Sequence, residues 1–231
     1  MPSANAAADS PPQLPPELEP DFLSFKSILS TRLASGVIHA GAMPLLARFG
    51  ILVHEQSERL ALVARGDRPI LFTRHVLDSL NPIESLSPPP ASALDVGSGA
   101  GFPGIPLAIV WPETRITLLE SRDKKCGFLE RAARELGLRN VTVLCARLED
   151  YGKTWSAEPH ACVLVRAVGS LPLILSRAKA AAAPGARWVY FLGEDVATDR
   201  LIQELGPTGS TASVIVGPFG GRLLCGGFQK T

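Results

Sequence analysis

The sequence contains no apolar run long enough to cross a membrane. A transmembrane helix needs about 20 consecutive apolar residues, and charged, proline or glycine residues interrupt every apolar stretch of this chain well before that length. The N-terminal stretch MPSANAAADSPPQLPPELEP also lacks the basic start and the apolar segment of a secretory signal. We therefore expect a cytoplasmic protein that does not associate with membranes.

Cysteine is scarce and widely spaced. Cys126, Cys145, Cys162 and Cys225 include no C-x-x-C pair. This spacing disfavours a zinc site and, in a chain of this length, a disulfide framework. The histidines other than His75 form no cluster with metal-ligand spacing either. We expect reduced, mostly buried cysteines and no bound metal.

A strong charge of either sign is missing as well. The chain carries 23 Lys and Arg against 22 Asp and Glu, for a net charge of +1. Dedicated nucleic-acid binders usually show a clear basic excess, so composition alone leaves the partner open. With 231 residues and 46% apolar content, the chain is long enough for one sizeable α/β domain with an appendage.

The residues that are present divide the chain into three parts. The first 20 residues are rich in Pro, Ala and Ser without apolar periodicity, which predicts a disordered tail. Apolar residues then recur at helical spacing up to Leu80, and NPIESLSPPPAS follows, so residues 21–90 are expected to form a helical cap and a linker. Residues 91–231 are expected to form the main domain.

The main domain alternates strand and helix patterns. The apolar runs ALDV, RITLLE, VTVLCARL, ACVLVRAV and RWVYFLG are each followed by a loop and a helical stretch. Repeated strand–helix units predict a mainly parallel sheet covered on both faces. The end of the chain, TASVIVGPFGGRLLCGGFQK, lacks a helical period and predicts two strands joined by a turn, as an antiparallel edge.

A glycine-rich loop follows the first predicted strand. In LDVGSGAGFPG, Asp95 precedes Gly97, Gly99 and Gly101, which predicts a ligand held close to the backbone at the carboxyl end of the strand. Dinucleotide oxidoreductases favour G-x-G-x-x-G, and Phe102 occupies the place of their third glycine. The acid at the rim also suits a cationic or amino-bearing ligand better than a pyrophosphate. The pattern therefore favours S-adenosylmethionine over a nicotinamide coenzyme.

Later strand ends supply further candidates. Glu120 lies 19 residues after Gly101, where ribose hydroxyls need an acceptor. Leu148 and Glu149 follow the third strand and are expected near the adenine. Arg166, at the end of the fourth strand, either reaches the surface or points into the cleft, and the cleft is favoured.

The basic and titratable residues leave several interpretations open. His75 and Asp78 are three residues apart on one predicted helix face. A structural pair that holds the cap over the cleft is favoured over general-base chemistry or RNA contact. The stretch SRDKKCGFLERAAR offers basic residues for RNA phosphates, although most charged residues on a helix are simply solvated. The candidates for substrate contact are Arg74, His75, Arg122, Lys124 and Lys125.

Residues 94–150 resemble the GidB family, also called RsmG, the bacterial enzymes that methylate guanine N7 in the 530 loop of 16S ribosomal RNA. The extension GFPGIPL after the glycine loop is more specific than the loop alone. FTRHVLDSL and VRAVGSL match two further family segments. The resemblance covers roughly residues 59 to 193.

The resemblance implies a Rossmann-like class I methyltransferase fold, with a mainly parallel seven-stranded sheet, an antiparallel edge strand and a helical N-terminal cap. It implies S-adenosylmethionine as cofactor, and 16S rRNA or the small ribosomal subunit as partner. Separately from the resemblance, we expect a monomer. Arg166 is implied beside the cofactor as the catalytic residue. The cofactor-binding set is then Asp95, Gly97, Gly99, Gly101, Phe102, Glu120, Leu148, Glu149 and Arg166.

The chain departs from the family pattern at two places. Arg59 and Leu60 stand where the family has an aromatic-Asn-Leu-Thr segment, and Leu192 stands where it has a lysine. Both places bear on RNA contact rather than on the glycine loop. The competing hypotheses are a methyltransferase for another RNA or a small molecule, a nicotinamide-dependent oxidoreductase, and a non-catalytic ribosome-binding relative.

Overall fold

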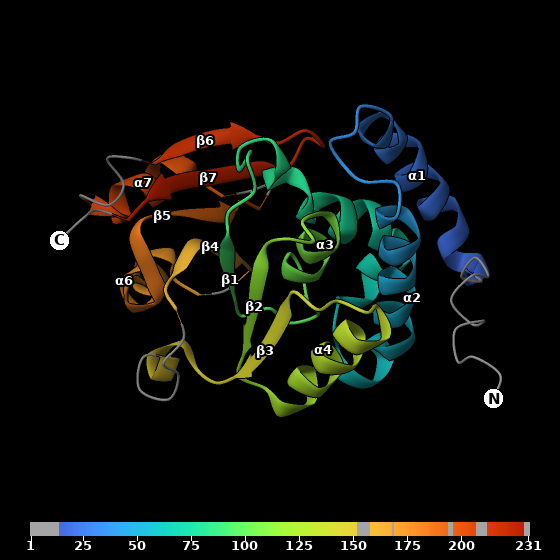
Figure 1. Ribbon diagram of the computed structural model, residues 1–231, viewed down its shortest axis with the longest axis horizontal. Coiled ribbons are helices and arrows are strands. Elements are labelled where there is room, and N and C mark those ends of the chain that lie inside the picture. The colour runs from blue at the N-terminus through green and yellow to red at the C-terminus, as the bar shows by residue number, and fades with distance from the viewer. Residues whose placement is uncertain (1–13, 152–157, 168, 194–195, 207–211, 229–231) are drawn as a thin grey trace.

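The computed structural model of the chain describes residues 14–151, 158–167, 169–193, 196–206 and 212–228. Within these residues, one seven-stranded sheet lies between two layers of helices (Figure 1). The strands are β1 Ser92–Val96, β2 Arg115–Glu120, β3 Val141–Cys145, β4 His160–Arg166, β5 Ala182–Phe191, β6 Ser213–Val216 and β7 Arg222–Gly227. The α-helices are α1 Glu19–Ala34, α2 Ala42–Leu60, α3 Gly104–Val110, α4 Asp123–Glu135, α6 Leu171–Ala178 and α7 Thr198–Glu204.

Short helical turns complete the set. Five are 3₁₀ turns and one, η3, is a π-helix. A π-helix within a chain often marks a functional site, and η3 holds the FTRHVL segment. The turns are η1 Pro16–Leu18, η2 Arg65–Ile70, η3 Phe72–Leu77, η4 Asn81–Ile83, η5 Leu148–Asp150 and η6 Lys179–Ala181.

The sheet has the strand order β3-β2-β1-β4-β5-β7-β6. Strands β1 to β5 pair in parallel, whereas β7 pairs antiparallel with both β5 and β6. The parallel pairs need long crossover connections, which the helices provide, while β6 and β7 are joined by a short turn. The predicted sheet, including its antiparallel edge, is confirmed.

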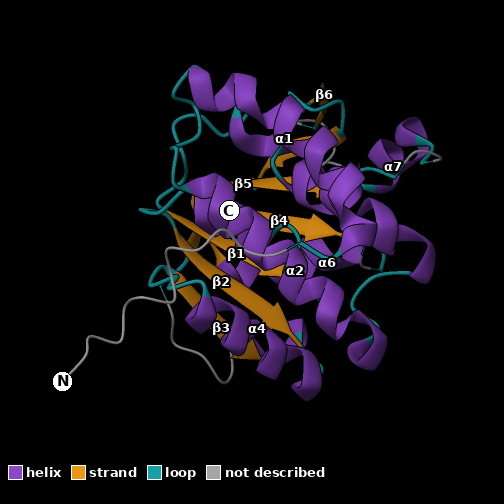
Figure 2. Ribbon diagram, turned by 90° about the vertical axis from the view of Figure 1, so that its right-hand side faces the viewer, coloured by secondary structure: helices purple, strands orange, loops and turns teal. Residues whose placement is uncertain are grey.

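Helices cover both faces of the sheet, as Figure 2 shows. Neighbouring residues of β1 belong to different apolar clusters: Ala93 packs with residues of α1 to α4, and Leu94 packs with residues of α6. Every residue of β1 is buried, as expected for a central parallel strand covered on both sides. Among the described residues, the structure contains no helix with the length and apolar character needed to span a membrane.

The helical cap is held together by its own internal contacts, and it packs against the main domain through a shared apolar core. The Asp21 carboxylate accepts hydrogen bonds from the backbone N–H groups of Phe72 and Thr73, at 2.6 and 3.2 Å. A Cβ on Gly50 of α2 would lie 2.4 Å from the Phe72 ring, so glycine lets η3 pack against α2. Phe49 of the cap also meets Phe102 edge-on, with ring centroids 5.2 Å apart.

One sequence expectation for this region is corrected. The tail was expected to extend through residue 20, but η1 begins at Pro16, α1 begins at Glu19, and Leu18 is fully buried. Residues 1–13 lie outside the described residues. At the start of the expected linker, the residues of η4 are buried. The division into cap and main domain near residue 91 stays a prediction.

Candidate functional site

A cavity of about 1000 Å³ opens where the carboxyl ends of β1, β2, β4 and β5 meet. The strand order reverses between β1 and β4, which is where doubly wound sheets hold their ligands. Segments of the cap and of the β6–β7 turn line the same cavity. The predicted site residues that line it are Gly97, Gly99, Phe102, Glu120, Arg166, Arg74, His75, Arg122 and Lys125.

The glycines of the loop have two different tasks. All three have positive φ, at 71° for Gly97, 58° for Gly99 and 95° for Gly101, a region that glycine adopts without strain. A Cβ on Gly99 would meet nothing closer than 3.7 Å, so the space beside it belongs to the cavity. A Cβ on Gly101 would lie 2.7 Å from Ile105. Gly101 therefore serves the packing of α3, and it does not line the cavity.

Glu120 joins the glycine loop to the turn that follows β2. One carboxylate oxygen accepts the N–H of Gly99 at 2.9 Å. The other accepts the N–H groups of Ser121 and Arg122 at 2.8 and 3.0 Å. The side chain still lines the cavity. Its carboxylate is therefore fixed by three backbone donors and remains within reach of a ligand.

Asp95 does not stand at the rim of the loop, as the sequence suggested. Its side chain is buried, its Oδ2 accepts the Gly104 N–H at 3.2 Å, and its Oδ1 has no partner. Burial raises the pKa of Asp95 to about 7, although hydrogen bonds from Ser98 and Gly104 oppose the increase. The Asp95 side chain extends from β1 toward the start of α3, where it accepts the Gly104 N–H. Asp95 therefore stabilises the glycine loop from its buried side. Its predicted contact with a cofactor stays untested.

The raised pKa of Asp95 predicts a pH-dependent stability. Between its ordinary pKa of 3.8 and about 7 the folded state holds a proton that the unfolded state has lost, so this contribution to stability falls as pH rises through 7. Asp95→Asn removes the dependence. We expect the variant to gain about 3 kcal/mol over the wild type between pH 5 and pH 8, measured by urea unfolding. An equal difference at both pH values would show that Asp95 is ionised throughout.

Arg166 connects the end of β4 to the helical cap through several polar contacts. Its guanidinium forms an ion pair with Asp78 at 2.9 Å and donates to the backbone carbonyl of Arg74 at 3.3 Å and to Nδ1 of His75 at 3.2 Å. It also lies 5.8 Å from the ring centroid of Phe102. Arg166 lines the cavity as favoured from the sequence, and most of its donors are directed to the cap.

His75 and Asp78 form no hydrogen-bonded pair with each other, contrary to the favoured interpretation. Nε2 of His75 lies 3.0 Å from the Asp67 carboxylate, so with Nδ1 accepting from Arg166 the ring carries its proton on Nε2. Burial and the Arg166 charge lower the pKa of His75 to about 4. His75 is therefore neutral near pH 7, and both of its nitrogens are engaged. Each of the two residues holds the cap through Arg166 instead.

Leu148 and Glu149 do not line the cavity. They lie in η5, where the chain turns away after β3, and the Glu149 carboxylate pairs with Arg177 of α6 at 2.5 Å. Leu148 packs against the apolar cluster on the α6 side of the sheet. The expected adenine contacts of both residues stay predictions, which the cavity lining does not support.

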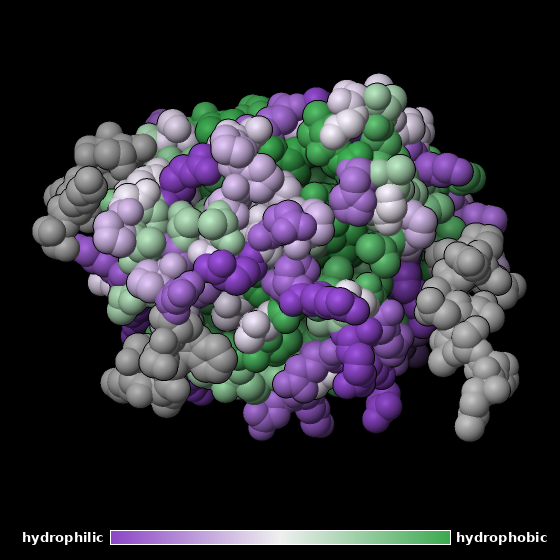
Figure 3. Space-filling view, in the orientation of Figure 1, coloured by the Kyte–Doolittle hydropathy of each residue, from purple (hydrophilic) through white to green (hydrophobic). Residues whose placement is uncertain are grey.

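The basic residues of α4 and Arg122, which directly precedes the helix, are divided between two cavities. Arg122 and Lys125 line the main cavity. Lys124 instead lines a smaller cavity of about 320 Å³ between α2 and α4, together with Arg59 and Arg131. Figure 3 shows strongly hydrophilic residues gathered over α4. Contact of these residues with RNA stays a prediction. Within the described part of the chain, no cluster of three or more His, Cys, Asp or Glu could hold a metal ion.

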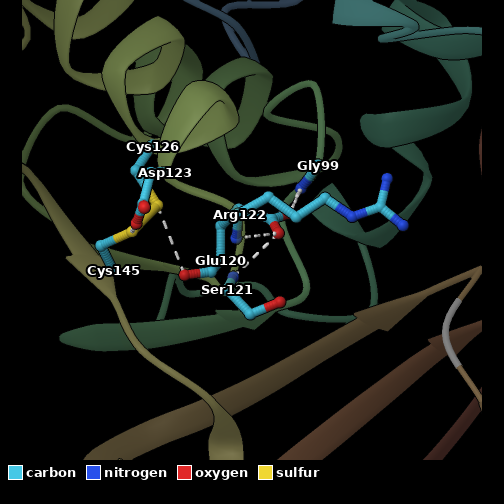
Figure 4. Close-up of a disulfide and its surroundings, with 7 residues drawn as sticks. All are labelled: Gly99, Glu120, Ser121, Arg122, Asp123, Cys126 and Cys145. Carbon is cyan, nitrogen blue, oxygen red and sulfur yellow. Dashed lines mark hydrogen bonds between the residues drawn. A yellow bond between two sulfur atoms is a disulfide. The ribbon is translucent and has the colours of Figure 1, made fainter.

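A disulfide joins Cys126 and Cys145 beside this site, which corrects the expectation of four reduced cysteines. Cys126 lies in the first half of α4 and Cys145 ends β3, with their Cα atoms 5.8 Å apart. Figure 4 shows the bond next to Glu120, whose backbone carbonyl oxygen is 3.4 Å from the Cys126 sulfur. The register of β2 and β3 sets Cys145 opposite Glu120. Sequence spacing does not reveal this proximity, because it arises from strand pairing.

The disulfide predicts a measurable response to reductant. The bond closes a loop with a sequence separation of 19, which limits the unfolded chain and corresponds to about 3 kcal/mol of stability. Dithiothreitol should lower the free energy of unfolding of the wild type by about this amount. Cys145→Ser is the matched control, because the exposed side chain is replaced by a similar one, and its stability should not respond to dithiothreitol. An unchanged wild type would show that the bond adds no stability.

The comparisons with known proteins identify the family. A family model described as rRNA small subunit methyltransferase G, GidB, matches residues 43–205, more than half of the chain. The chain belongs to the GidB family. The ribosomal RNA small subunit methyltransferase G of Solibacter usitatus (strain Ellin6076) is 48% identical over 122 residues, covering 53% of this chain and 56% of the relative. That of Roseiflexus sp. (strain RS-1) is 43% identical over 126 residues, covering 54% of each.

The curated GidB relatives and this chain align over limited lengths. The chain spans about half the length of the curated relatives it matches. Two solved structures resemble nearly the whole chain: the cofactor-bound Rv0187 from MTB, with TM-score 0.58 and 20% identity over 93% of this chain and 98% of that chain, and the O-methyltransferase TomG from Streptomyces achromogenes in complex with SAM, with TM-score 0.55 and 16% identity over 90% and 98%. These similarities confirm the Rossmann-like methyltransferase fold.

The departures from the GidB pattern lie at both cavities. Leu192, where the sequence resemblance places a lysine, lines the main cavity beside Phe191 at the end of β5. Arg59 and Leu60 line the smaller cavity against α4. This GidB chain therefore presents an apolar surface at the β5 end and a basic one at the end of α2.

Two residues that shape one wall of the cavity were not predicted from the sequence. Phe219, in the β6–β7 turn, lines the cavity, and Asn81 of η4 holds that turn in place. The only sequence signal was the run GPFGG, which places an aromatic residue among glycines in a turn. Asn81 carried no signal, because it stood at the start of an apparent linker.

Proposed function

We propose that this GidB-family protein transfers the methyl group of S-adenosylmethionine to guanine N7 in the 530 loop of 16S ribosomal RNA. The observation that carries the proposal is one cavity that combines an open glycine loop, the fixed carboxylate of Glu120 and the aromatic ring of Phe102 at the reversal point of the sheet. The family membership of the chain supports the same reaction.

The residues of the cavity fit this cofactor. The open space beside Gly99 admits a ligand to the backbone, and Glu120 offers acceptor oxygens for ribose hydroxyls. When bound, the cofactor supplies an electrophilic methyl group on a sulfonium. The protein aligns the two reactants and excludes water, and Arg166, which lines the cavity between Phe102 and Phe191, orients them.

The acceptor chemistry follows from the side chains around the cavity. Guanine N7 has an unshared electron pair and no proton, so its methylation needs no general base. His75 is neutral with both nitrogens engaged, which leaves no base poised there. Methylation at a pyrimidine C5 needs a thiolate, but burial raises the pKa of Cys162 to about 12 and that of Cys225 to about 11, and neither lines the cavity.

The proposed partner is 16S rRNA or the small ribosomal subunit, met in the cytoplasm by a monomer. Arg122 and Lys125, which line the main cavity, and Lys124, which lines the smaller one, are proposed to hold RNA phosphates together with Arg74 on the cap side. The contact expected for His75 has less support, because both of its nitrogens are engaged within the protein. Phosphate contacts would set affinity, while the target base has to leave the RNA stack to reach the cofactor.

Mapping of N7-methylguanine tests the proposal. Borohydride and aniline cleave RNA at this base, so ribosomal RNA from cells with the protein should show a cleavage site in the 530 loop that is lost without it. Undermethylated small subunits, free 16S rRNA and small molecules should then be compared as substrates of the purified protein. Calorimetry with S-adenosylhomocysteine and with NAD(H) separates the remaining hypotheses. Binding of NAD(H) alone would identify an oxidoreductase, and cofactor binding without turnover would identify a non-catalytic relative.

A further inference from the structure

The cavity continues well past the glycine loop. Glu120 and the glycines occupy its β1–β2 side, whereas Arg166, Phe191 and Arg222 line it at the ends of β4, β5 and β7. In the strand order, β4, β5 and β7 lie on the other side of β1 from β2. If the nucleoside part of the cofactor occupies the β1–β2 side, the β4–β5–β7 side is where the acceptor enters.

Phe219 belongs to this acceptor side. It lies in the turn between β6 and β7 and packs against the main apolar cluster while also lining the cavity. The rings of Phe102 and Phe191 each have the Arg166 guanidinium 5.8 Å from their centroids. Phe219, in contrast, makes no ring or cation contact with any residue that the structure describes. A flat aromatic side chain is thus available at the cavity wall.

Asn81 holds the turn that carries Phe219. Its Oδ1 accepts the N–H groups of Phe219 and Gly221, both at 3.1 Å. Its Nδ2 donates to the Asp78 carboxylate at 3.0 Å, and Asp78 pairs with Arg166. A continuous set of polar contacts therefore links the turn to the end of β4.

The glycines of the turn make room for this anchor. A Cβ on Gly217 would lie 2.5 Å from the Asn81 side chain, and one on Gly221 would lie 2.1 Å from it. The turn is closed by the Gly217 N–H, which donates to the Gly221 carbonyl at 2.8 Å. The run GPFGG thus sets the turn directly against η4. A docked turn presents its aromatic residue at a fixed place, which a free loop would not do.

We propose that Phe219 is the stacking surface for the guanine that receives the methyl group, and that Asn81 is the positioning residue that holds it there. The inference rests on the proposed function, because it concerns the acceptor side of the same cavity. A base extruded from RNA loses its stacking neighbours and is commonly held against an aromatic side chain. Stacking of this kind tolerates any base, so Phe219 contributes to the affinity for the extruded base, and the cofactor site is independent of it.

Phe219→Ala tests the stacking role. Loss of one base–aromatic stack corresponds to roughly a 10- to 100-fold decrease in kcat/KM for undermethylated small subunits. The Kd for S-adenosylhomocysteine, measured by calorimetry, should stay within about twofold of the wild type, because Phe219 lies outside the cofactor side. Phe219→Trp should keep most of the activity, and Phe219→Leu should not. Phe228→Ala is the matched control, since Phe228 is partly buried near the end of the same hairpin and packs on the opposite sheet face.

The positioning role of Asn81 is tested by two substitutions. Asn81→Asp combined with Asp78→Asn keeps an acceptor for the turn and a donor–acceptor contact between positions 81 and 78, so it should lose less activity than Asn81→Leu, which keeps neither. Asn81→Leu should lower activity much less when Phe219 is already alanine than in the wild-type background, and the part of its effect that remains reports on the contact of Asn81 with Asp78. Thermal unfolding identifies variants that fail to fold, and for these the comparison rests on Phe219→Leu against Phe219→Trp.

The outcomes separate this inference from the proposed function. A wild type that methylates no ribosomal RNA overturns both. A wild type that is active, with Phe219→Ala equal to it or with Leu as good as Trp, overturns the stacking role and leaves the function intact. A Phe219→Ala variant that loses cofactor binding to the same extent as activity also overturns it, because the residue would then serve the cofactor side.

Discussion

Replacing Glu120 with alanine is expected to weaken binding of S-adenosylhomocysteine by roughly 100-fold. The carboxylate accepts from Gly99, Ser121 and Arg122, so its loss frees the glycine loop from the turn after β2. The same substitution removes the proposed acceptor for the ribose hydroxyls. Two lost hydrogen bonds to an ionised acceptor, at about 1.5 kcal/mol each, amount to this decrease. Isothermal titration calorimetry measures it directly.

Two further variants test whether the carboxylate of Glu120 is the cause of the weaker binding. Glu120→Gln keeps one acceptor oxygen and should lose roughly 10-fold, because one set of backbone donors stays paired. Glu149→Gln is the control, since Glu149 pairs with Arg177 outside the cavity, and its Kd should match the wild type. If Glu149→Gln weakened binding as strongly as Glu120→Ala, the chain after β3 would contact the cofactor as the sequence suggested, and the cavity would be misassigned.

The sheet and the glycine loop could be predicted because their signals are local. Each parallel strand is a short, largely apolar run, the central strand β1 is buried throughout, and RITLLE ends at Glu120 as β2 does. The spacing of Gly97, Gly99 and Gly101 reflects a backbone that turns three times through positive φ. Such patterns depend on neighbours in the chain, so they are visible without the fold.

The residues whose positions were not predicted from the sequence are placed by contacts between segments that lie far apart in the chain. Asp95 was expected at the cavity rim, but the strand period turns it toward α3, where Gly104 supplies a donor. Cys126 and Cys145 meet only because β3 pairs with β2. Asn81 contacts a turn that lies 138 residues later in the chain. No local pattern carries this information.

Replacing Arg166 with methionine is expected to lower the free energy of unfolding by about 3 kcal/mol and to abolish methyl transfer. The substitution keeps much of the side-chain volume against Phe102 and Phe191 but removes the ion pair with Asp78 and the donors to η3. Burial raises the pKa of Asp78, whereas the Arg166 charge lowers it. The variant therefore leaves a largely buried carboxylate without its cation, which is the main cost. Urea unfolding at pH 7 measures the change.

The double variant Arg166→Met/Asp78→Asn distinguishes an unpaired charge from lost packing. The asparagine removes the orphaned carboxylate and can still accept from Asn81, so the double variant should recover at least half of the lost stability, although methyl transfer should stay absent.

Arg166→Lys should be nearly as stable as the wild type, since it keeps the charge, but its single ammonium does not reproduce the forked contacts to η3. Recovery of stability without recovery of activity in the double variant would show that Arg166 stabilises the fold and supports methyl transfer through separate effects. Full activity in Arg166→Lys would show that only its charge matters, and no recovery in the double variant would place the cost in packing against Phe102 and Phe191.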